Sequence, residues 1–354
     1  MNDMAEPSKL DALSGKVVGD IAGALGILMA YLGDQTGLYD KLDQGGPQTI
    51  DQLSDASGLN PKYLREWLGS NAAAGYVSYD AGDDSYSLSE EQALVFAREG
   101  QPACLQGFFQ VVVSQFETLD LAVETFRTGQ GRAWGEHAGN CFCATDRFFR
   151  PGYAANLLDS WIPSLDGVGE RLKKQGATIA DIGCGHGSSS ILLARAFPNA
   201  HVTGFDFHAP SIEAANAQAA AEGLNNLEFQ VAKAQDYPGD DYDFACIFDA
   251  LHDMGDPVGA AQHIRQSLKP DGTLMLVEPL AGDHLSDNLH PLGQIFYALS
   301  TTICTPASLA QEVGLGLGAQ AGEARLTSVL NEAGFSRVRR AAETGTNMVL
   351  EVRR

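Results

Sequence analysis

The chain has 354 residues, 44% of them hydrophobic, which is enough for two domains with a sizeable buried core. Its formal net charge of −22 argues against nonspecific binding to nucleic acid or to an anionic membrane, because both partners are themselves negative. The six cysteines form no CxxC pair, and the longest apolar run, at residues 21–32, is only about 12 residues and too short to span a bilayer. We therefore expect a cytoplasmic protein with free thiols.

Residues 1–100 are expected to be mostly helical and to end in a β-hairpin. The first helix should close at Gly33 or Gly37, and a later helix should begin after an Asn60 cap, with Pro61 at its first position. The stretch "YVSYDAGDDSYSLS" alternates on both sides of a Gly/Asp turn, as a hairpin does. Helix, turn, helix and hairpin in this order resemble a winged-helix domain.

Charge bears on whether this first segment binds DNA. Residues 1–100 contain 16 acidic and 6 basic residues, and the predicted wing carries Asp80, Asp83 and Asp84 where a DNA-binding protein would carry cations. We therefore expect the segment to serve dimerisation or to cover a substrate.

The rest of the chain divides into a linker and an α/β domain. Residues 101–170 read as helices rich in aromatic side chains that contribute to a pocket. From 171 to 354, strands alternate with helices, except that the last two strands are consecutive, so one of these two should be antiparallel. The expected fold class is α/β, with a doubly wound, mainly parallel, seven-stranded Rossmann-like sheet after a mostly α-helical winged-helix-like domain.

The stretch "TIADIGCGHGSSS" runs an apolar strand into three glycines, Gly183, Gly185 and Gly187. The third glycine stands one place too early for a dinucleotide fingerprint, and no lysine follows as a P-loop requires. S-adenosylmethionine (SAM) remains, since its binding needs bare backbone but no phosphate contact. Asp206 ends the second strand, where an acid can accept hydrogen bonds from both ribose hydroxyls.

This part of the chain resembles class I SAM-dependent methyltransferases, whose motif order it repeats in "IADIGCGHG", "GFDF", "VAKAQDYP", "FDALHDMGDP" and "LKPDGTLMLVEP". The winged-helix-like segment resembles the N-terminal domain of the bacterial small-molecule enzymes. This resemblance implies a homodimer, SAM as cofactor with S-adenosylhomocysteine as product, and a small-molecule methyl acceptor. It also implies roles for particular residues: Asp206 would hold the ribose, Phe207, Ala234 and Gln235 would contact adenine, Tyr153 would reach the SAM carboxylate, and the other cofactor residues would be Asp181, Gly183, Gly185, Gly187 and Asp249.

Methyl transfer from a sulfonium is an in-line displacement, so positioning dominates, and a base helps where the acceptor must lose a proton. Candidate catalytic residues follow the fourth and fifth strands, where open α/β sheets bind ligands: His252, Asp253 and Glu278. The expected acceptor pocket takes residues from the linker and from the insertion after the fifth strand: Trp134, His137, His290, Tyr297 and Cys304.

The acceptor atom stays open between oxygen, nitrogen and sulfur. Cys141, Cys143 and Cys304 would bind a soft metalloid only if the fold brought them together, so we expect a metal-independent reaction. The alternatives are a SAM- or ligand-responsive winged-helix transcriptional regulator and an S-methyltransferase of a small thiol or sulfide.

Overall fold

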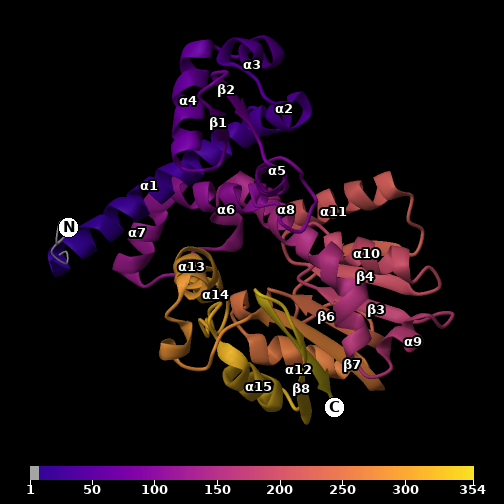
Figure 1. The fold of residues 1–354 in the computed structure, drawn as a ribbon. Helices are drawn as coiled ribbons and strands as arrows, with labels where there is room; N and C mark the ends of the chain where they lie inside the picture. The colour runs from indigo at the N-terminus through magenta and orange to yellow at the C-terminus, as the bar shows by residue number, and fades with distance from the viewer. Residues whose placement is uncertain (1–7) are drawn as a thin grey trace, which may run out of the picture. The chain divides into compact units, whose positions relative to one another are not determined.

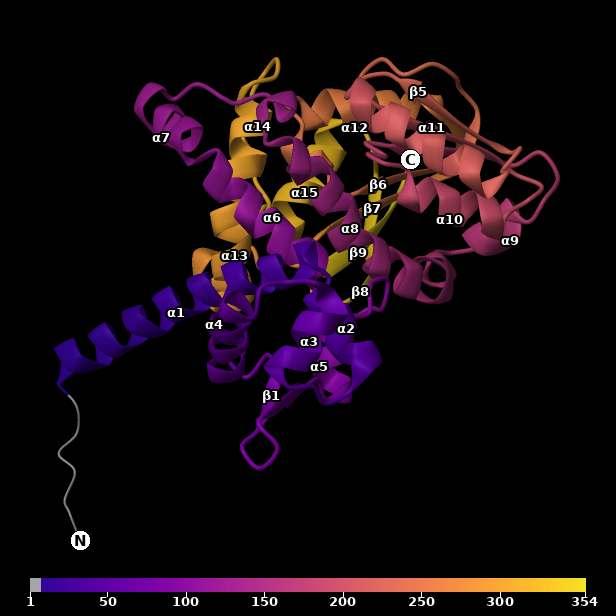
Figure 2. The ribbon, with the colours of Figure 1, turned by 90° about the horizontal axis from the view of Figure 1, so that it is seen from above.

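The computed structural model describes residues 8–354, and they form two compact units (Figures 1 and 2). The first unit extends to Phe116, and the second covers Glu117–Arg354. The predicted linker at 101–170 is therefore shared between the two units. Its boundaries, and those of the domains at 1–100 and 171–354, stay predictions.

The first unit has the helix, helix and hairpin order that the sequence predicts. Asn60 accepts a hydrogen bond from the backbone N–H of Lys62, with Pro61 as the first helical residue. Tyr39 packs against both Trp67 and Phe96, with ring centroids 5.1 Å apart in each pair. The elements are α1 (Lys9–Gln35), α2 (Leu38–Gly45), α3 (Ile50–Ser57), α4 (Pro61–Ala73), β1 (Ser78–Asp80), β2 (Ser85–Ser87), α5 (Glu90–Phe96) and α6 (Gln106–Glu117).

Helix α1 is longer than the sequence prediction allows. It begins after a capping box between Ser8 and Asp11 and continues for 27 residues. Within residues 8–354 it is the one helix long and apolar enough to cross a bilayer, judged on length and composition alone, with a mean hydropathy of 1.5. The prediction that no segment is long enough to span a bilayer rested on the uninterrupted apolar run at residues 21–32. The helix continues through single charged residues on either side of that run.

The second unit is an α/β fold around a seven-stranded sheet, which confirms the predicted fold class. Its order is β5-β4-β3-β6-β7-β9-β8, and all neighbours are parallel except β9, which runs antiparallel to β7 and β8. The strands are β3 (Thr178–Ile182), β4 (His201–Asp206), β5 (Leu227–Val231), β6 (Tyr242–Phe248), β7 (Leu268–Pro279), β8 (Arg337–Glu343) and β9 (Asn347–Arg353).

Helices cover both faces of this sheet (Figure 1). One buried cluster joins one face of the sheet to α8, η2, α9 and α10, and another joins the opposite face to α12 and α15. The remaining elements are α7 (Leu119–Thr128), η1 (Trp134–Glu136), α8 (Gly139–Asn156), η2 (Leu157–Trp161), η3 (Ile162–Ser164), α9 (Val168–Leu172), α10 (Ser188–Ala196), α11 (Ala209–Glu222), η4 (Leu251–Asp253), α12 (Pro257–Ser267), η5 (Leu285–Asn288), α13 (Pro291–Leu299), η6 (Ser300–Cys304), α14 (Thr305–Leu309) and α15 (Gly322–Glu332).

The strand order reverses at β3. The chain runs from β3 outward through β4 to β5, then returns to place β6 on the other side of β3. In open α/β sheets, ligands bind beyond the carboxyl ends of the strands at such a switch point. Most of the predicted cofactor and catalytic residues lie near the carboxyl ends of β3, β4, β6 and β7 or directly after them. Ala234 and Gln235 follow β5, and Tyr153 lies on α8.

Candidate active site

The glycine turn between β3 and α10 needs its glycines for two different reasons. All three have positive φ, which other residues rarely adopt. A Cβ on Gly187 would lie 2.4 Å from the Phe229 ring, so packing alone excludes a side chain there. A Cβ on Gly185 would meet nothing within 4 Å, so the middle of the turn borders open space. This is the bare backbone that the sequence pattern assigns to a ligand.

Asp181 lies fully buried on β3, immediately below this turn. Its Oδ2 accepts hydrogen bonds from the hydroxyls of Ser189 and Ser190, both at 2.6 Å. Its Oδ1 is buried without a hydrogen-bond partner among the described residues. Burial raises the pKa of Asp181 to about 6, against the lowering effect of the two serines. The site therefore holds an acid with one free acceptor oxygen.

Asp206, at the end of β4, is tied to the same turn. Its Oδ2 accepts from the backbone N–H of Gly185 at 2.9 Å and its Oδ1 from that of His208 at 2.8 Å. Each carboxylate oxygen keeps further acceptor capacity for ribose hydroxyls. Beside it, Phe207 is 49% exposed, so part of its side chain is accessible to a ligand.

Two of the three residues predicted to contact adenine, Ala234 and Gln235, follow β5. Ala234 packs partly buried against the core under the sheet. The Gln235 side-chain amide donates to the backbone oxygen of Asp256 at 3.3 Å, which ties this loop to the start of α12. Their contact with adenine stays a prediction.

Asp249 follows β6 in a strained backbone conformation, with φ of 49°. Its Oδ1 accepts from the Asn347 side-chain amide at 2.7 Å, and its Oδ2 is buried without a hydrogen-bond partner among residues 8–354. Burial and the nearby Glu278 raise the pKa of Asp249 to about 8. The ring of Tyr153 packs on Phe248, with centroids 5.0 Å apart, and the Asp249 charge adds to burial in raising the pKa of Tyr153.

His252 and Glu278, predicted as catalytic, form a buried pair. His252 Nδ1 lies 2.5 Å from Glu278 Oε2, and the other carboxylate oxygen accepts from the backbone N–H of Leu251 at 3.0 Å. Burial alone would lower the pKa of His252, but the charges of Glu278 and Asp253 raise it well above its usual range. The pair therefore holds the imidazole in one orientation and makes it a stronger base.

Cys304 joins this pair from a distant part of the sequence. It ends η6, and its sulfur lies within 4.8 Å of the side-chain ligand atoms of both His252 and Asp253. Ser308 donates to the backbone oxygen of Met254 at 2.8 Å, so α14 is fixed to the segment that follows η4. The insertion after β7 therefore packs on the catalytic candidates.

The two linker residues predicted for the acceptor pocket have different surroundings: Trp134 lies in an aromatic stack, and His137 contacts the buried side chain of Arg132. Trp134 packs on Phe142, which packs on His208, with ring centroids 5.4 Å and 4.6 Å apart. This stack connects the linker to the residue that follows the Asp206 loop. His137 instead bonds through Nδ1 to Arg132, and burial beside that cation lowers the pKa of His137 to about 4.

Two further residues predicted for the acceptor pocket are placed at α13. His290 is the N-cap of this helix, where its Nδ1 accepts from the backbone N–H of Gly293 at 3.1 Å. Tyr297 is 36% exposed. Their contact with an acceptor stays a prediction, and the imidazole of His290 already has a structural role.

Sequence reasoning missed several residues that shape the site. Ser189 and Ser190 stand in the quoted glycine stretch, and Ser188 beside them donates to Asp146 at 2.5 Å. Three consecutive serines at the start of a helix could have indicated hydroxyl groups that bond to nearby acids. Asn347 and Arg132 had no such signal, because their partners lie 98 and 170 residues away along the chain.

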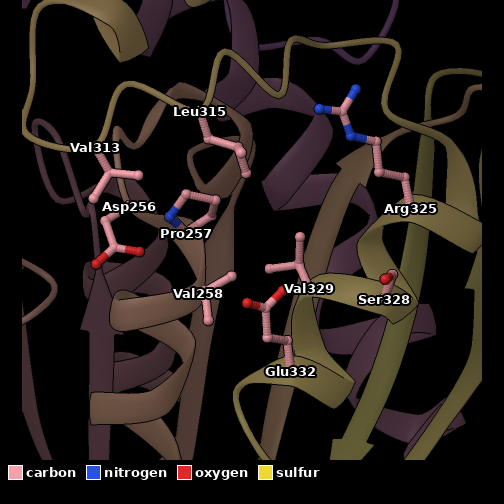
Figure 3. Close-up of a pocket in the computed structure, with 9 residues that line it drawn as sticks. All are labelled: Asp256, Pro257, Val258, Val313, Leu315, Arg325, Ser328, Val329 and Glu332. Carbon is pink, nitrogen blue, oxygen red and sulfur yellow. The ribbon is translucent and has the colours of Figure 1, made fainter.

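A pocket of about 380 Å³ lies apart from these residues, between α12, α15 and the loop before α15 (Figure 3). None of the predicted site residues lines it. Val313 contributes from this loop with a positive φ of 72°, which is unusual for a β-branched residue. The lining residues are Asp256, Pro257, Val258, Val313, Leu315, Arg325, Ser328, Val329 and Glu332.

Known protein families match both parts of the chain. Residues 173–334 match a family described as a methyltransferase domain, and residues 23–98 match the Rv2258c-like winged helix-turn-helix domain. The chain is 24% identical over 334 residues to the mitomycin biosynthesis 6-O-methyltransferase of Streptomyces lavendulae, an alignment that covers 89% of this chain and 87% of the relative. Two other curated methyltransferases are 33% and 36% identical over shorter segments, and the chain spans only 42% and 43% of their lengths.

Solved structures show the same fold over the whole chain. The mitomycin 7-O-methyltransferase MmcR is 22% identical and superposes with a TM-score of 0.70, covering 98% of this chain and 100% of its own. Human N-acetylserotonin methyltransferase in complex with SAM is 17% identical, with a TM-score of 0.72 and 99% coverage of both chains.

The fold and the site thus define a class I methyltransferase domain that follows a winged helix-turn-helix domain. The two matched domains stand in the order that the sequence resemblance predicts, a winged helix-turn-helix domain followed by a methyltransferase domain. These matches favour an enzyme over the transcriptional regulator.

Proposed function

We propose that this protein transfers a methyl group from SAM to a hydroxyl oxygen of a small molecule. The observation that carries the proposal is the buried His252–Glu278 pair, which lies at the same sheet edge as the glycine turn. When bound, SAM supplies an electrophilic methyl group. A hydroxyl must lose a proton as it attacks that group, and the histidine held by Glu278 is an acid–base group at this edge that can take it. O-Methyltransferases among the relatives support oxygen over nitrogen or sulfur.

The residues of this chain fit the proposed cofactor. Gly185 borders open space, and Asp206 next to it offers carboxylate oxygens for ribose hydroxyls. Asp181 presents a buried Oδ1 without a partner among the described residues, which suits a hydrogen-bond donor such as the SAM amino group. Acids around the turn suit a ligand that carries a sulfonium cation.

The base is His252, with Glu278 as its positioning residue. The short contact at Nδ1 directs the second ring nitrogen, Nε2, away from Glu278 and toward the side that Asp253 and Cys304 border. The hydroxyl proton moves to Nε2, and the Glu278 carboxylate stabilises the imidazolium that results. The two residues thereby form one acid–base unit.

The experiment that tests this proposal measures S-adenosylhomocysteine by mass spectrometry after incubation with SAM and a panel of phenols, aliphatic alcohols, amines and thiols. We expect turnover with hydroxyl compounds. His252→Ala should lower kcat by about 10²-fold or more while SAM affinity is retained. Turnover with thiols alone would instead establish the S-methyltransferase. Tight SAM binding without turnover of any class would reject the proposal.

A second copy of this chain is the proposed partner, and α1 its contact surface. Within the first unit, α1 leaves a row of large apolar side chains exposed, and Gly19 among them has open space where a Cβ would lie. Burying such a row against a second α1 removes apolar surface from water. The exposed side chains are Leu10, Leu13, Val17, Val18, Ile21, Leu25, Leu28 and Leu32. A dimer that hides this row fits the proposed cytoplasmic location.

A further inference from the structure

Three side chains beside the proposed base bring together three different ligand atoms. The imidazole of His252, the carboxylate of Asp253 and the thiol of Cys304 place a nitrogen, an oxygen and a sulfur within 4.8 Å of one another. His252 Nε2 and Asp253 Oδ1 are 3.2 Å apart. The nitrogen and the oxygen are as close as two ligands of one small cation, and the sulfur is near enough to complete the set after a small side-chain movement.

We propose that His252, Asp253 and Cys304 form a binding site for Zn²⁺. Zinc takes imidazole, thiolate and carboxylate ligands in this combination, with three protein ligands and an open fourth position. A thiolate in the set disfavours Mg²⁺ and Ca²⁺, which prefer oxygen ligands. The sequence predicted no metal, because the cysteines have no zinc-like spacing and the acidic residues are scattered. His252 and Cys304 are 52 residues apart.

The surroundings of His252 support the assignment. A histidine that binds a metal through one ring nitrogen usually donates the N–H of the other to a carboxylate, which fixes the ring and strengthens the ligand. Glu278 occupies that position, 2.5 Å from Nδ1, and is itself held by the backbone N–H of Leu251. Nε2 is therefore the nitrogen that faces the other two ligands.

Asp253 supplies the third ligand. Its Oδ1 is buried and lies 3.2 Å from His252 Nε2, and its carboxylate also shares a hydrogen bond with Cys304. A cation at this point would replace these contacts with bonds to all three side chains. Gln311, which follows α14, donates to the backbone oxygen of Asp253 at 2.9 Å and so holds the segment after Cys304 against η4.

The zinc site has a consequence that rests on the proposed function. A metal ion on Nε2 takes the lone pair that the base uses to accept the hydroxyl proton. Zinc-loaded protein is therefore expected to bind SAM but to lose methyl transfer to hydroxyl acceptors. Zinc binding itself does not depend on that activity.

The test is a titration of the metal-free, full-length protein with Zn²⁺, followed by calorimetry, with Mg²⁺ as the oxygen-preferring comparison. We expect saturable binding of one Zn²⁺, which Cys304→Ser and Asp253→Asn each weaken at least 10-fold. Cys143→Ser is the matched control, because Cys143 is an exposed thiol that the cluster does not contain, and it should leave binding unchanged. Retained S-adenosylhomocysteine binding shows that each variant is folded.

A spectroscopic arm keeps the proposal testable even if the Cys304 variant does not fold. Co²⁺ added to the Cys143→Ser protein should give a thiolate-to-cobalt charge-transfer band, and its absence overturns the site. Zinc binding that Cys304→Ser leaves unchanged also overturns it, and zinc binding without loss of turnover rejects Nε2 as a ligand. If no acceptor is methylated at all, the titration still decides the zinc site, so the two proposals fail separately.

Discussion

Asp181, Asp249 and Asp253 share a property at the scale of single residues. Each has one buried carboxylate oxygen that accepts no regular hydrogen bond among residues 8–354, and that of Asp253 lies 3.2 Å from His252 Nε2. Buried acceptors are normally satisfied, so the oxygens of Asp181 and Asp249 indicate places where a ligand completes the bonding. Burial raises the pKa of each of these acids, and a bound cationic or donor group would reverse that shift.

Asp206 provides the sharpest test of the cofactor site at this scale. Asp206→Ala should weaken S-adenosylhomocysteine binding by about 1–3 kcal/mol, because it removes a charged acceptor. Isothermal titration calorimetry measures the change. Asp240→Ala, at an exposed position outside the site, is the control and should bind normally. Unchanged affinity for the Asp206 variant would place the ribose elsewhere.

At the scale of elements, the turn between β3 and α10 has two roles: Gly187 packs against the core, and Gly185 borders the space proposed for the cofactor. The ligand-binding character of this turn could be predicted from sequence, because closely spaced glycines after an apolar strand are typical of a turn that binds a ligand through its backbone. The separate tasks of its glycines could not, because the Phe229 ring that blocks Gly187 comes from β5. Long-range neighbours of this kind are set only by the assembled sheet.

Gly185 and Gly187 form a matched pair for separating those tasks. Alanine at either position meets a positive φ, which costs about 1–2 kcal/mol. Gly187→Ala also overpacks Phe229, so it should destabilise the fold by about 1–3 kcal/mol more. Gly185→Ala should instead mainly weaken cofactor binding. Urea denaturation and calorimetry distinguish the two, and equal stability losses would contradict this division.

Asp243 on β6 links three strands and predicts a pH effect. Its Oδ2 accepts from the backbone N–H of Thr178 at 2.9 Å and from Lys269 at 2.8 Å. Burial alone would raise the pKa of Asp243, but these partners outweigh it and lower the pKa in the folded protein. The stabilisation is therefore complete above the unfolded pKa and is lost as pH falls through the lowered folded value.

Asp243→Asn should thus lower the free energy of unfolding by about 1–3 kcal/mol at neutral pH. The difference from the unmodified protein should shrink below about pH 4, where the aspartate becomes protonated in the unfolded chain. Urea denaturation at a series of pH values provides the measurement. A difference that is constant down to about pH 3, below the usual aspartate pKa, would show that the charge of Asp243 contributes nothing.

At the scale of the whole molecule, the architecture could be predicted from the sequence, but most long-range contacts between side chains could not. The seven strands, the antiparallel last pair and the winged-helix order follow from hydrophobic periodicity and turn residues, which are local signals. The full length of α1 escaped prediction, because single charges interrupt its apolar run. The joining of Cys304 to His252 depends on how the insertion folds back, and no local pattern encodes that.

Helix α1 carries the prediction for assembly. Ile21→Glu places a charge in the middle of its exposed apolar row, where a second copy would bury it, so the dimer should dissociate. Light scattering coupled to size-exclusion chromatography reports the mass. Lys16→Glu, on the same helix at an exposed charged position, is the control and should remain dimeric. A monomer for the unmodified chain, or binding to lipid vesicles in place of dimerisation, would refute the proposed pairing.

The position of β9 has a consequence for how the molecule is made. This strand lies between β7 and β8, and β8 pairs with no other strand in the described chain. During synthesis, the backbone N–H and C=O groups of β8 therefore have no partner strand until β9, which ends at residue 353, has left the ribosome. A nascent chain that stalls before β9 would expose two open strand edges, β7 and β8, to pairing with other chains. The seven-residue strand β9 thus covers the open edge of β7 and gives β8 its partner strand.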